Sequence, residues 1–175
     1  LYMRIDQVML GAMLSTTTEV GVYSAAVQIA AMWYFIPLAI ITSFKPVIMS
    51  MKKNSDKQRY LSTVQMLYTI IAWVGIGFGL FISLFSDLIV MIIYGQEFIK
   101  ASSILTISIW AGTFAMLGTA RSIWIISEGL QKYILVYTAT GFLVNLILNL
   151  LLIPIFEGYG AAIATLFAQF FANVL

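Results

Sequence analysis

The sequence predicts an all-α bundle of membrane-spanning helices. Of its 175 residues, 62% are hydrophobic and only 9% are charged, whereas about 25% of the residues of a soluble domain are charged. Polar turns separate the apolar sequence into several stretches that reach ~20 residues, the length that crosses a bilayer. So few charges cannot cover the surface of a soluble protein, and we therefore expect the membrane to be the solvent of this chain.

Six helices are expected from the spacing of these turns. They cover residues 1–14, 20–50, 61–85, 101–127, 133–155 and 160–175. The second is too long for one straight span, and we expect Pro37 and Pro46 to kink it, because proline removes a backbone hydrogen bond. Residues 87–100 are expected to form a connecting turn with a short interfacial segment that ends at Tyr94 and Gly95.

Small and polar side chains recur at helical spacing on three of these helices. Gly75 and Gly79 form a pair that allows a second helix to approach closely. One face of the fifth helix carries Thr138, Gly141, Asn145 and Asn149. The last helix has one ladder of Gly160, Ala164, Ala168 and Ala172, and a second of Ala161, Thr165, Gln169 and Asn173. The first ladder suits close packing, and the second is expected to face a polar surface.

Two charges interrupt the first apolar stretch. Arg4 and Asp6 lie among leucine, isoleucine, valine and methionine residues, where a charge costs roughly 2.5–3.5 kcal/mol at the bilayer centre. Being two residues apart, they point to nearly opposite sides of a helix and cannot neutralise each other. Each therefore needs a partner on another helix, and the sequence predicts that this stretch forms the wall of a polar cavity.

Basic residues gather in the connections on one side. The connections at 50–60 and 128–132 contain five Lys and Arg residues, whereas those at 15–19, 86–100 and 156–159 contain only Lys100. An excess of Lys and Arg in short loops marks the cytoplasmic side. We therefore expect the loops at 50–60 and 128–132 to be cytoplasmic and the first helix to run outward.

Composition also narrows the functional class. The net charge is +2 and dispersed, so nothing indicates binding to nucleic acid. Neither Cys nor His occurs, and the sequence predicts no thiol chemistry, no metal site and no cofactor. No connection is long enough for an inserted catalytic domain, and we do not expect an enzyme. Because the chain begins and ends inside apolar stretches, we expect it to be a fragment of a longer membrane protein.

Three segments resemble one transporter family. The segment RIDQVMLGAMLSTTTEVGVYSAAVQI, with KPVIMSM after it, resembles the start of the second lobe of bacterial polysaccharide (O-antigen type) flippases. The segments YGQEFIKASSIL and NLILNLLLIPIFEGYGAAIATL follow in the order and spacing of the same family. These flippases belong to one superfamily with multidrug MATE exporters and lipid II flippases, and the resemblance covers essentially the whole chain.

This resemblance implies a MATE-like, two-lobe bundle of 12 to 14 helices, of which the chain supplies the first part of the second lobe. The cavity of such a transporter accepts an undecaprenyl-pyrophosphate-linked oligosaccharide at the cytoplasmic face of the bacterial inner membrane and releases it outside. Its partners are the lipid-linked glycan, membrane lipids, the missing first lobe and, in parts of the superfamily, a coupling proton or sodium ion.

Six residues are candidates for the cavity. They are Arg4, Asp6, Gln28, Arg121, Asn145 and Asn149. Guanidinium groups pair well with phosphate oxygens, so Arg4 and Arg121 could attract the pyrophosphate. The alternatives are an inter-lobe salt bridge or snorkelling to the surface for Arg4, and snorkelling to lipid phosphates for Arg121. Asp6 is either a coupling carboxylate or the structural partner of a basic residue. The amides either contact sugar or hold helices together.

Other functions stay open at this point. A MATE-like exporter of organic cations needs acidic cavity residues, and Asp6 is the one intramembrane carboxylate that the sequence offers. A membrane glycosyltransferase or polymerase that acts on the same lipid carrier is a weaker alternative, because the sequence has no paired acids in a large loop. An inert membrane scaffold is disfavoured by the charges in the apolar stretch and by the polar helix faces.

Overall fold

A computed structural model describes residues 5–14, 17–53 and 56–174, and every regular element in this part of the chain is helical. The elements are α1 (Ile5–Met13), α2 (Thr17–Met32), α3 (Phe35–Lys53), α4 (Lys57–Tyr94), the short 3₁₀ helix η2 (Gln96–Phe98), α5 (Ala101–Ser127) and α6 (Gln131–Val174). The predicted all-α bundle is confirmed. The expected helix at 101–127 agrees with α5 at both ends.

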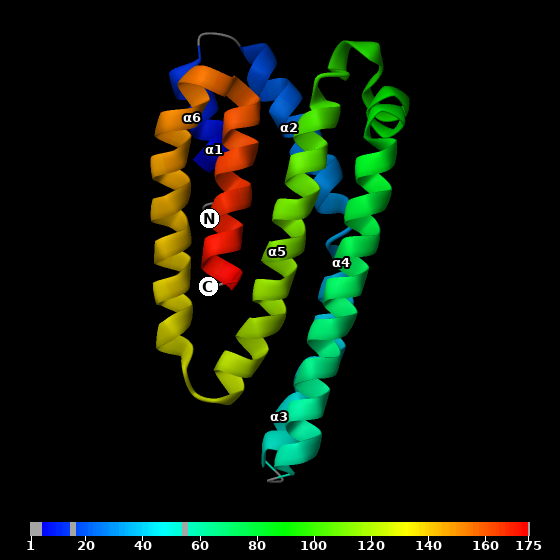
Figure 1. Cartoon of the computed structure of the whole chain (residues 1–175), viewed down its shortest axis with the longest axis vertical. Helices are drawn as coiled ribbons and strands as arrows, with labels where there is room; N and C mark the ends of the chain where they lie inside the picture. Colours follow the sequence, from blue (N-terminus) through cyan, green and yellow to red (C-terminus); the bar gives the residue numbers. More distant parts are fainter. Residues whose placement is uncertain (1–4, 15–16, 54–55, 175) are drawn as a thin grey trace.

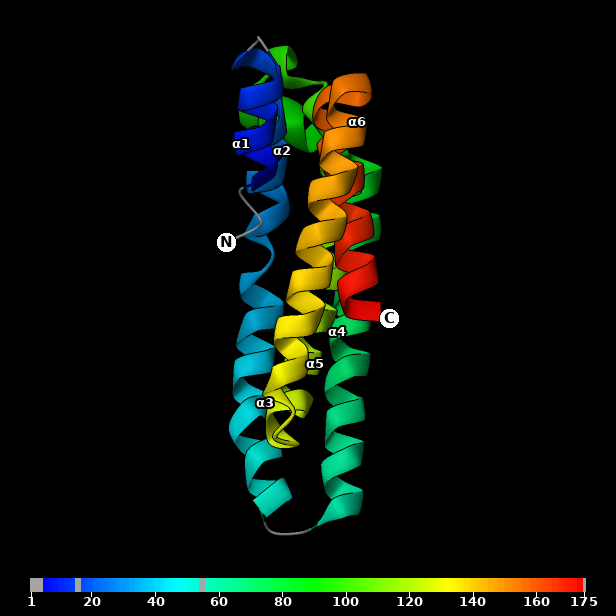
Figure 2. The same ribbon diagram turned by 90° about the vertical axis from the view of Figure 1, so that its left-hand side faces the viewer.

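Helix α5 lies at the centre of the bundle. It packs against α2, α3, α4 and α6, which lie around it in two roughly perpendicular views (Figures 1 and 2). Of its most apolar stretch, 56% is buried, compared with 22% or less in the other three long apolar helices. Apolar side chains on those outer helices therefore face away from the protein, as they do on helices that contact lipid.

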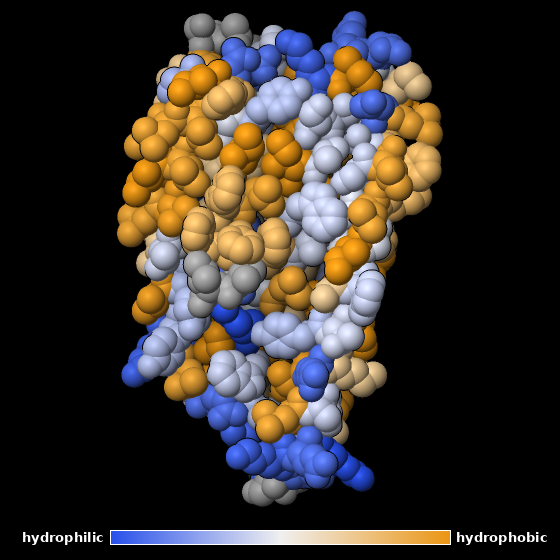
Figure 3. Space-filling view, viewed as in Figure 1, coloured by the Kyte–Doolittle hydropathy of each residue, from blue (hydrophilic) through white to orange (hydrophobic). Residues whose placement is uncertain are grey.

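Among the residues that the structure describes, four helices are long and apolar enough to cross a membrane: α3, α4, α5 and α6. Apolar side chains cover the flanks of the visible face, whereas hydrophilic side chains gather at its two ends (Figure 3). The exposed side chains include Trp73, Leu84, Ile92 and Ile155, each at least 69% exposed. A soluble protein rarely exposes so many large apolar groups together, and the chain is therefore that of a multi-pass membrane protein.

The expected single bent helix at 20–50 is wrong. The chain breaks at Trp33 and Tyr34, so that α2 and α3 are separate helices. Pro37 lies in the first turn of α3, where a missing N–H group leaves no hydrogen bond unmade. The proline is therefore accommodated by starting a new helix just before it, not by bending a continuous one. Pro46 remains inside α3, as expected.

The expected end of the third helix at residue 85 coincides with a kink in α4. Phe85 (φ −112°, ψ 15°) is not helical and divides α4 into two helical parts, of which the second continues to Tyr94. Residues 86–94 contain no proline or glycine, so this second part stays helical until Gly95, where the sequence had placed the end of the segment. The part of α4 before this kink, residues 57–84, is about 42 Å long, and the α3–α4 hairpin extends beyond the α5–α6 loop (Figure 2).

Gly75 and Gly79 bring α4 against α5, as the small-residue pair predicted. A methyl group on Gly75 would lie 2.5 Å from the Thr113 side chain, and one on Gly79 would lie 3.1 Å from the indole ring of Trp110. The Thr113 hydroxyl donates a hydrogen bond to the carbonyl oxygen of Gly75 at 3.3 Å. The backbone of α4 therefore lies directly against side chains of α5 at these two glycines, in the middle of the membrane-spanning region.

Helix α6 consists of two antiparallel arms, residues 131–156 and 158–174, which Figure 1 shows folding back on each other. The turn lies at Glu157, which has a positive φ of 52°. A methyl group on Gly160 would collide with the Leu152 backbone. The predicted pair of helices with a turn between them is confirmed, although the first arm begins at Gln131 and ends past the expected residue 155.

The connections alternate between the two ends of the bundle, as expected of antiparallel helices (Figure 1). At the end predicted to be cytoplasmic, Lys52 Nζ lies 2.6 Å from Glu128 Oε2. The Tyr60 hydroxyl donates to the same carboxylate at 2.7 Å. These hydrogen bonds, that from Lys52 first, hold the pKa of Glu128 below its usual value. The contacts of Lys52 and Tyr60 with Glu128 hold the α3–α4 hairpin against the loop between α5 and α6.

Candidate functional site

A polar cluster occupies the otherwise apolar contact between α1, α2 and α6. At its centre is Asp6, which is 1% exposed. Its carboxylate accepts hydrogen bonds from the Asn149 amide at 2.6 Å, from the Thr165 hydroxyl at 2.7 Å and from the Tyr23 hydroxyl at 3.1 Å. The donors come from α2 and from both arms of α6, so one carboxylate connects four helical segments.

The two asparagines complete this cluster. Asn145 and Asn149 are both 0% exposed. The Asn149 amide also donates to Asn145 Oδ1 at 3.1 Å, and the Asn145 amide donates to the Thr165 hydroxyl at 3.3 Å. The fifth predicted helix is the first arm of α6. Its polar face carries these two asparagines, and that face packs against the second arm of α6 and against α1. Asn149 Oδ1 is buried without a hydrogen-bond partner.

Asp6 was expected either to couple an ion or to pair with a basic side chain. Among the residues that the structure describes, no Lys or Arg forms an ion pair with it, and neutral donors take that place. Arg4, the other charge of this stretch, lies outside the described residues. Burying an unpaired charge is costly, and hydrogen bonds to a carboxylate offset only part of that cost.

A pocket of about 370 Å³ opens beside this cluster. Its polar lining comprises Asp6, Gln7, Tyr23, Ser24, Gln28, Tyr34, Ser108, Thr165 and Gln169. Gln28 is exposed and lies at the outer part of the lining, where its side-chain oxygen accepts a long hydrogen bond of 3.4 Å from the Tyr94 hydroxyl. We call this space the Asp6 pocket. It places a carboxylate, hydroxyls and amides around a volume large enough for several water molecules.

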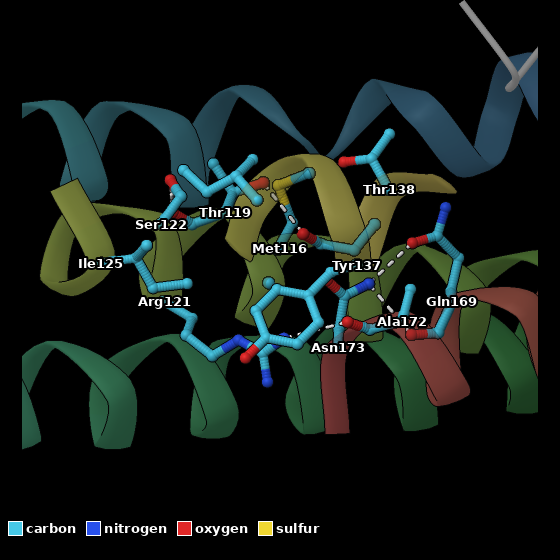
Figure 4. A pocket seen from close by; sticks show the side chains of 13 residues that line it. Met116, Thr119, Arg121, Ser122, Ile125, Tyr137, Thr138, Gln169, Ala172 and Asn173 are labelled. Carbon is cyan, nitrogen blue, oxygen red and sulfur yellow. Dashed lines mark hydrogen bonds between the residues drawn. The ribbon is translucent and has the colours of Figure 1, made fainter. Parts of the chain in front are cut away.

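A second pocket, of about 250 Å³, lies between α5 and the two arms of α6 (Figure 4). Its polar lining comprises Thr119, Arg121, Ser122, Tyr137, Thr138, Gln169 and Asn173. The guanidinium carbon of Arg121 lies 4.3 Å from the centre of the Tyr137 ring, and its Nη2 donates to the Ala172 carbonyl at 2.9 Å. We call this space the Arg121 pocket.

Arg121 has no carboxylate partner in the part of the chain that the structure describes. A guanidinium group has five N–H donors, and the structure places one hydrogen bond on it. Stacking on Tyr137 stabilises the cation without neutralising it. The remaining donors therefore suit an anionic group, and the Thr138 hydroxyl of the lining can add another hydrogen bond, whereas the hydroxyls of Thr119 and Ser122 donate to the Ala115 and Thr119 carbonyls.

The predicted site residues thus divide into two groups. Asp6, Asn145 and Asn149 form one hydrogen-bonded cluster, and Gln28 lines the pocket beside it. Arg121 lies in the other pocket. Chemically, one carboxylate with neutral oxygen donors suits a proton or a monovalent cation, because hard cations prefer oxygen ligands. The described residues contain no group of three or more His, Cys, Asp and Glu side chains that could hold a metal ion.

Sequence reasoning left three residues out of the site. Thr165 and Gln169 belong to the second ladder of the last helix, whose period of four was a usable signal, since that ladder was expected to face a polar surface. Tyr23 gave no such signal, because a tyrosine in a mostly apolar stretch is more often a packing residue. Only the fold places its hydroxyl on Asp6.

Taken together, long apolar helices around buried polar pockets define a polytopic membrane protein with a polar interior. Residues 1–103 match the family described as polysaccharide biosynthesis protein. Because this match covers more than half of the chain, the chain belongs to the polysaccharide biosynthesis protein family. The predicted family resemblance is thereby confirmed.

A curated relative agrees with this assignment. The probable low-salt glycan biosynthesis flippase Agl15 of Haloferax volcanii is 30% identical over an alignment that covers 94% of this chain. The alignment covers 34% of the relative, so the chain spans about a third of its length. No solved structure matches the chain.

Proposed function

We propose that this chain forms part of a transporter, not an enzyme, that flips a lipid-linked oligosaccharide across its membrane. Family membership and a relative named as a glycan biosynthesis flippase support the proposal. The buried polar cluster supports it as well, because ionisable groups inside a membrane protein mark transport pathways by default. The relative is archaeal, so placement in a bacterial inner membrane stays a prediction from the sequence.

In this proposal the Arg121 pocket attracts the phosphate groups or acidic sugars of the substrate. A guanidinium group binds phosphate oxygens in a bidentate manner, and the pocket adds the Thr138 hydroxyl as a further donor. Arg4 has the same predicted role, outside the described residues. Gln28 borders the Asp6 pocket, where an amide can contact sugar hydroxyls.

Asp6 is the proposed site of ion coupling. This role is supported by the burial of the Asp6 carboxylate, which is only 1% exposed, and by its described hydrogen-bond partners, which are all neutral. A proton or sodium ion that binds there neutralises the charge. Rotating the side-chain amide of Asn149 by half a turn would direct its oxygen, which has no hydrogen-bond partner among the described residues, toward Asp6 in place of the NH₂ group. In that orientation the amide provides an oxygen ligand for a cation.

The test uses the protein at its full natural length, reconstituted in liposomes with a fluorescent polyprenyl-pyrophosphate-linked glycan. Wild-type protein is expected to flip this lipid faster when a proton or sodium gradient is imposed. Asp6→Asn keeps the size of the side chain and is expected to remove the gradient dependence. Asp56→Asn is the matched control, because Asp56 is the half-buried N-cap of α4 and asparagine caps a helix as well as aspartate does. Undiminished gradient-driven flipping by Asp6→Asn would overturn the coupling role, and absence of flipping by wild type would overturn the function.

A second function, export of organic cations, is favoured by one observation. The Asp6 pocket combines a carboxylate with the aromatic ring of Tyr34, and such combinations attract cations. Uptake of a cationic dye into the same liposomes, with a gradient of opposite sign as the control, separates the two functions. Dye transport that depends on Asp6 in the absence of glycan-lipid flipping would select the exporter.

A further inference from the structure

The Asp6 pocket and the Arg121 pocket share one lining residue, Gln169. It lies on the second arm of α6 and is 1% exposed. The pockets hold opposite charges, a carboxylate in one and a guanidinium in the other. A side chain that borders both pockets can respond to a change of charge in either one. Because Gln169 is buried, water does not screen its electrostatic interaction with these charges.

Gln169 belongs to a continuous polar ladder on this arm. Thr165, one turn before it, donates its hydroxyl to Asp6 at 2.7 Å. Asn173, one turn after it, donates its amide to both the backbone oxygen and the side-chain oxygen of Gln169 at 2.9 Å, as Figure 4 shows. The neighbouring Ala172 carbonyl accepts the Arg121 hydrogen bond. One face of a single helical arm therefore contacts both charges.

The packing of α5 against this arm leaves little freedom at the Arg121 end. A methyl group on Gly118 would collide with the Asn173 amide oxygen, so Asn173 fits there only because residue 118 has no side chain. Displacement of the arm therefore displaces Asn173 and the Ala172 carbonyl together, and with them the partners of Arg121. Closely packed interiors respond to such shifts by changing between discrete arrangements.

We propose that Gln169 couples the two pockets, so that the proton or cation bound at Asp6 sets the affinity of the Arg121 pocket for a phosphate-bearing ligand. This inference rests on the proposed function. Neutralising Asp6 weakens its attraction for the Thr165 hydroxyl, and the change passes along the ladder through Gln169 to Asn173 and Arg121. Coupling between sites is a free energy and acts equally in both directions.

The test measures binding of a polyprenyl pyrophosphate to the purified full-length protein, in detergent, by isothermal titration calorimetry. Sodium is compared with choline at constant ionic strength, and each is measured at two pH values. For wild type, the dissociation constant is expected to change by about 5- to 150-fold between the ion conditions, the usual range of coupling. Gln169→Met keeps the length of the side chain and removes its amide, and it is expected to reduce this ratio to near one.

Controls give each outcome a meaning. Gln65→Met makes the same change at an exposed glutamine of α4 and should keep the wild-type ratio. Asp6→Asn should abolish the ratio, and Arg121→Gln should abolish binding. If Gln169→Met does not fold, as judged by size-exclusion chromatography, Asn173→Ala takes its place with the same expectation.

The possible failures are distinguishable. A wild-type ratio retained by Gln169→Met overturns the coupling role alone, because both pockets then still work. Binding by wild type without any ion dependence overturns the ion-coupling role of Asp6 and this inference. No binding of the pyrophosphate by wild type overturns the proposed substrate class and this inference together.

Discussion

At the scale of single residues, the Asp6 cluster determines how the interior of the helix bundle is held together. Hydrogen bonds to a charged acceptor are worth more than those between neutral groups, and three of them converge on one buried carboxylate. Loss of a donor leaves this charge less compensated. The cluster should therefore be sensitive to changes that hardly alter side-chain shape.

We predict that Thr165→Val destabilises the protein by about 1–3 kcal/mol, the usual cost of leaving a buried group without its hydrogen bond. Valine has the same shape as threonine but cannot donate to Asp6. Thr140→Val is the matched control, because Thr140 is exposed and bonds only to the Val136 carbonyl one turn earlier. The measurement is the thermal unfolding midpoint in detergent. Equal midpoints for both variants would contradict the prediction.

At the scale of helices, the turn between the two arms of α6 depends on close backbone contact. Glu157 has a positive φ, and Gly160 lies against the Leu152 backbone. Unlike a flexible side chain, a backbone cannot move aside cheaply. This turn brings Asn145 opposite Thr165, and therefore assembles part of the Asp6 cluster.

Gly160→Ala is predicted to destabilise the protein by about 1–3 kcal/mol, as overpacking does elsewhere. Gly77→Ala provides the control, since nothing lies within 4 Å of a methyl group at that position. Replacing an unhindered helical glycine by alanine is expected to be neutral or stabilising. Resistance to limited proteolysis and the unfolding midpoint both report the difference. A Gly160→Ala protein as stable as Gly77→Ala would show that the turn tolerates a side chain.

At the scale of the whole molecule, the alternating connections and the basic loops predict an orientation in the membrane. The 175 residues contain no cysteine, so single cysteines can be introduced in them once any cysteine elsewhere in the full-length protein is replaced. Glu97→Cys and Gln131→Cys lie at opposite ends of the bundle (Figure 1). Membrane-impermeant maleimide is expected to label Glu97→Cys from outside, and Gln131→Cys only after permeabilisation.

Ile147→Cys is the control for this labelling. Ile147 is 55% exposed, yet it faces lipid in the predicted arrangement and should react under neither condition. External labelling of Gln131→Cys together with protection of Glu97→Cys would reverse the predicted orientation. The distribution of Lys and Arg would then fail as a guide to the sidedness of this chain.

The sequence by itself determined the fold class, the solvent and most of the helices. The low fraction of charged residues and the lengths of the apolar stretches admit little besides a membrane bundle. Helix α5, the close approach at Gly75 and Gly79, and the pair of arms in α6 also followed from local patterns, because helical periodicity and small-residue spacing are properties of neighbouring residues. The same holds for the family, whose motifs are contiguous segments.

Tertiary structure decided the break between α2 and α3, which sequence reasoning missed, and the arrangement of the site. Pro37 can either bend a helix or begin one, and the packing of Trp33 on Phe78 at 5.4 Å accompanies a break instead of a bend. The partners of Asp6 lie 17, 143 and 159 residues away along the chain. No local pattern specifies contacts at that separation, because only the folded arrangement of the helices brings those side chains within hydrogen-bonding distance.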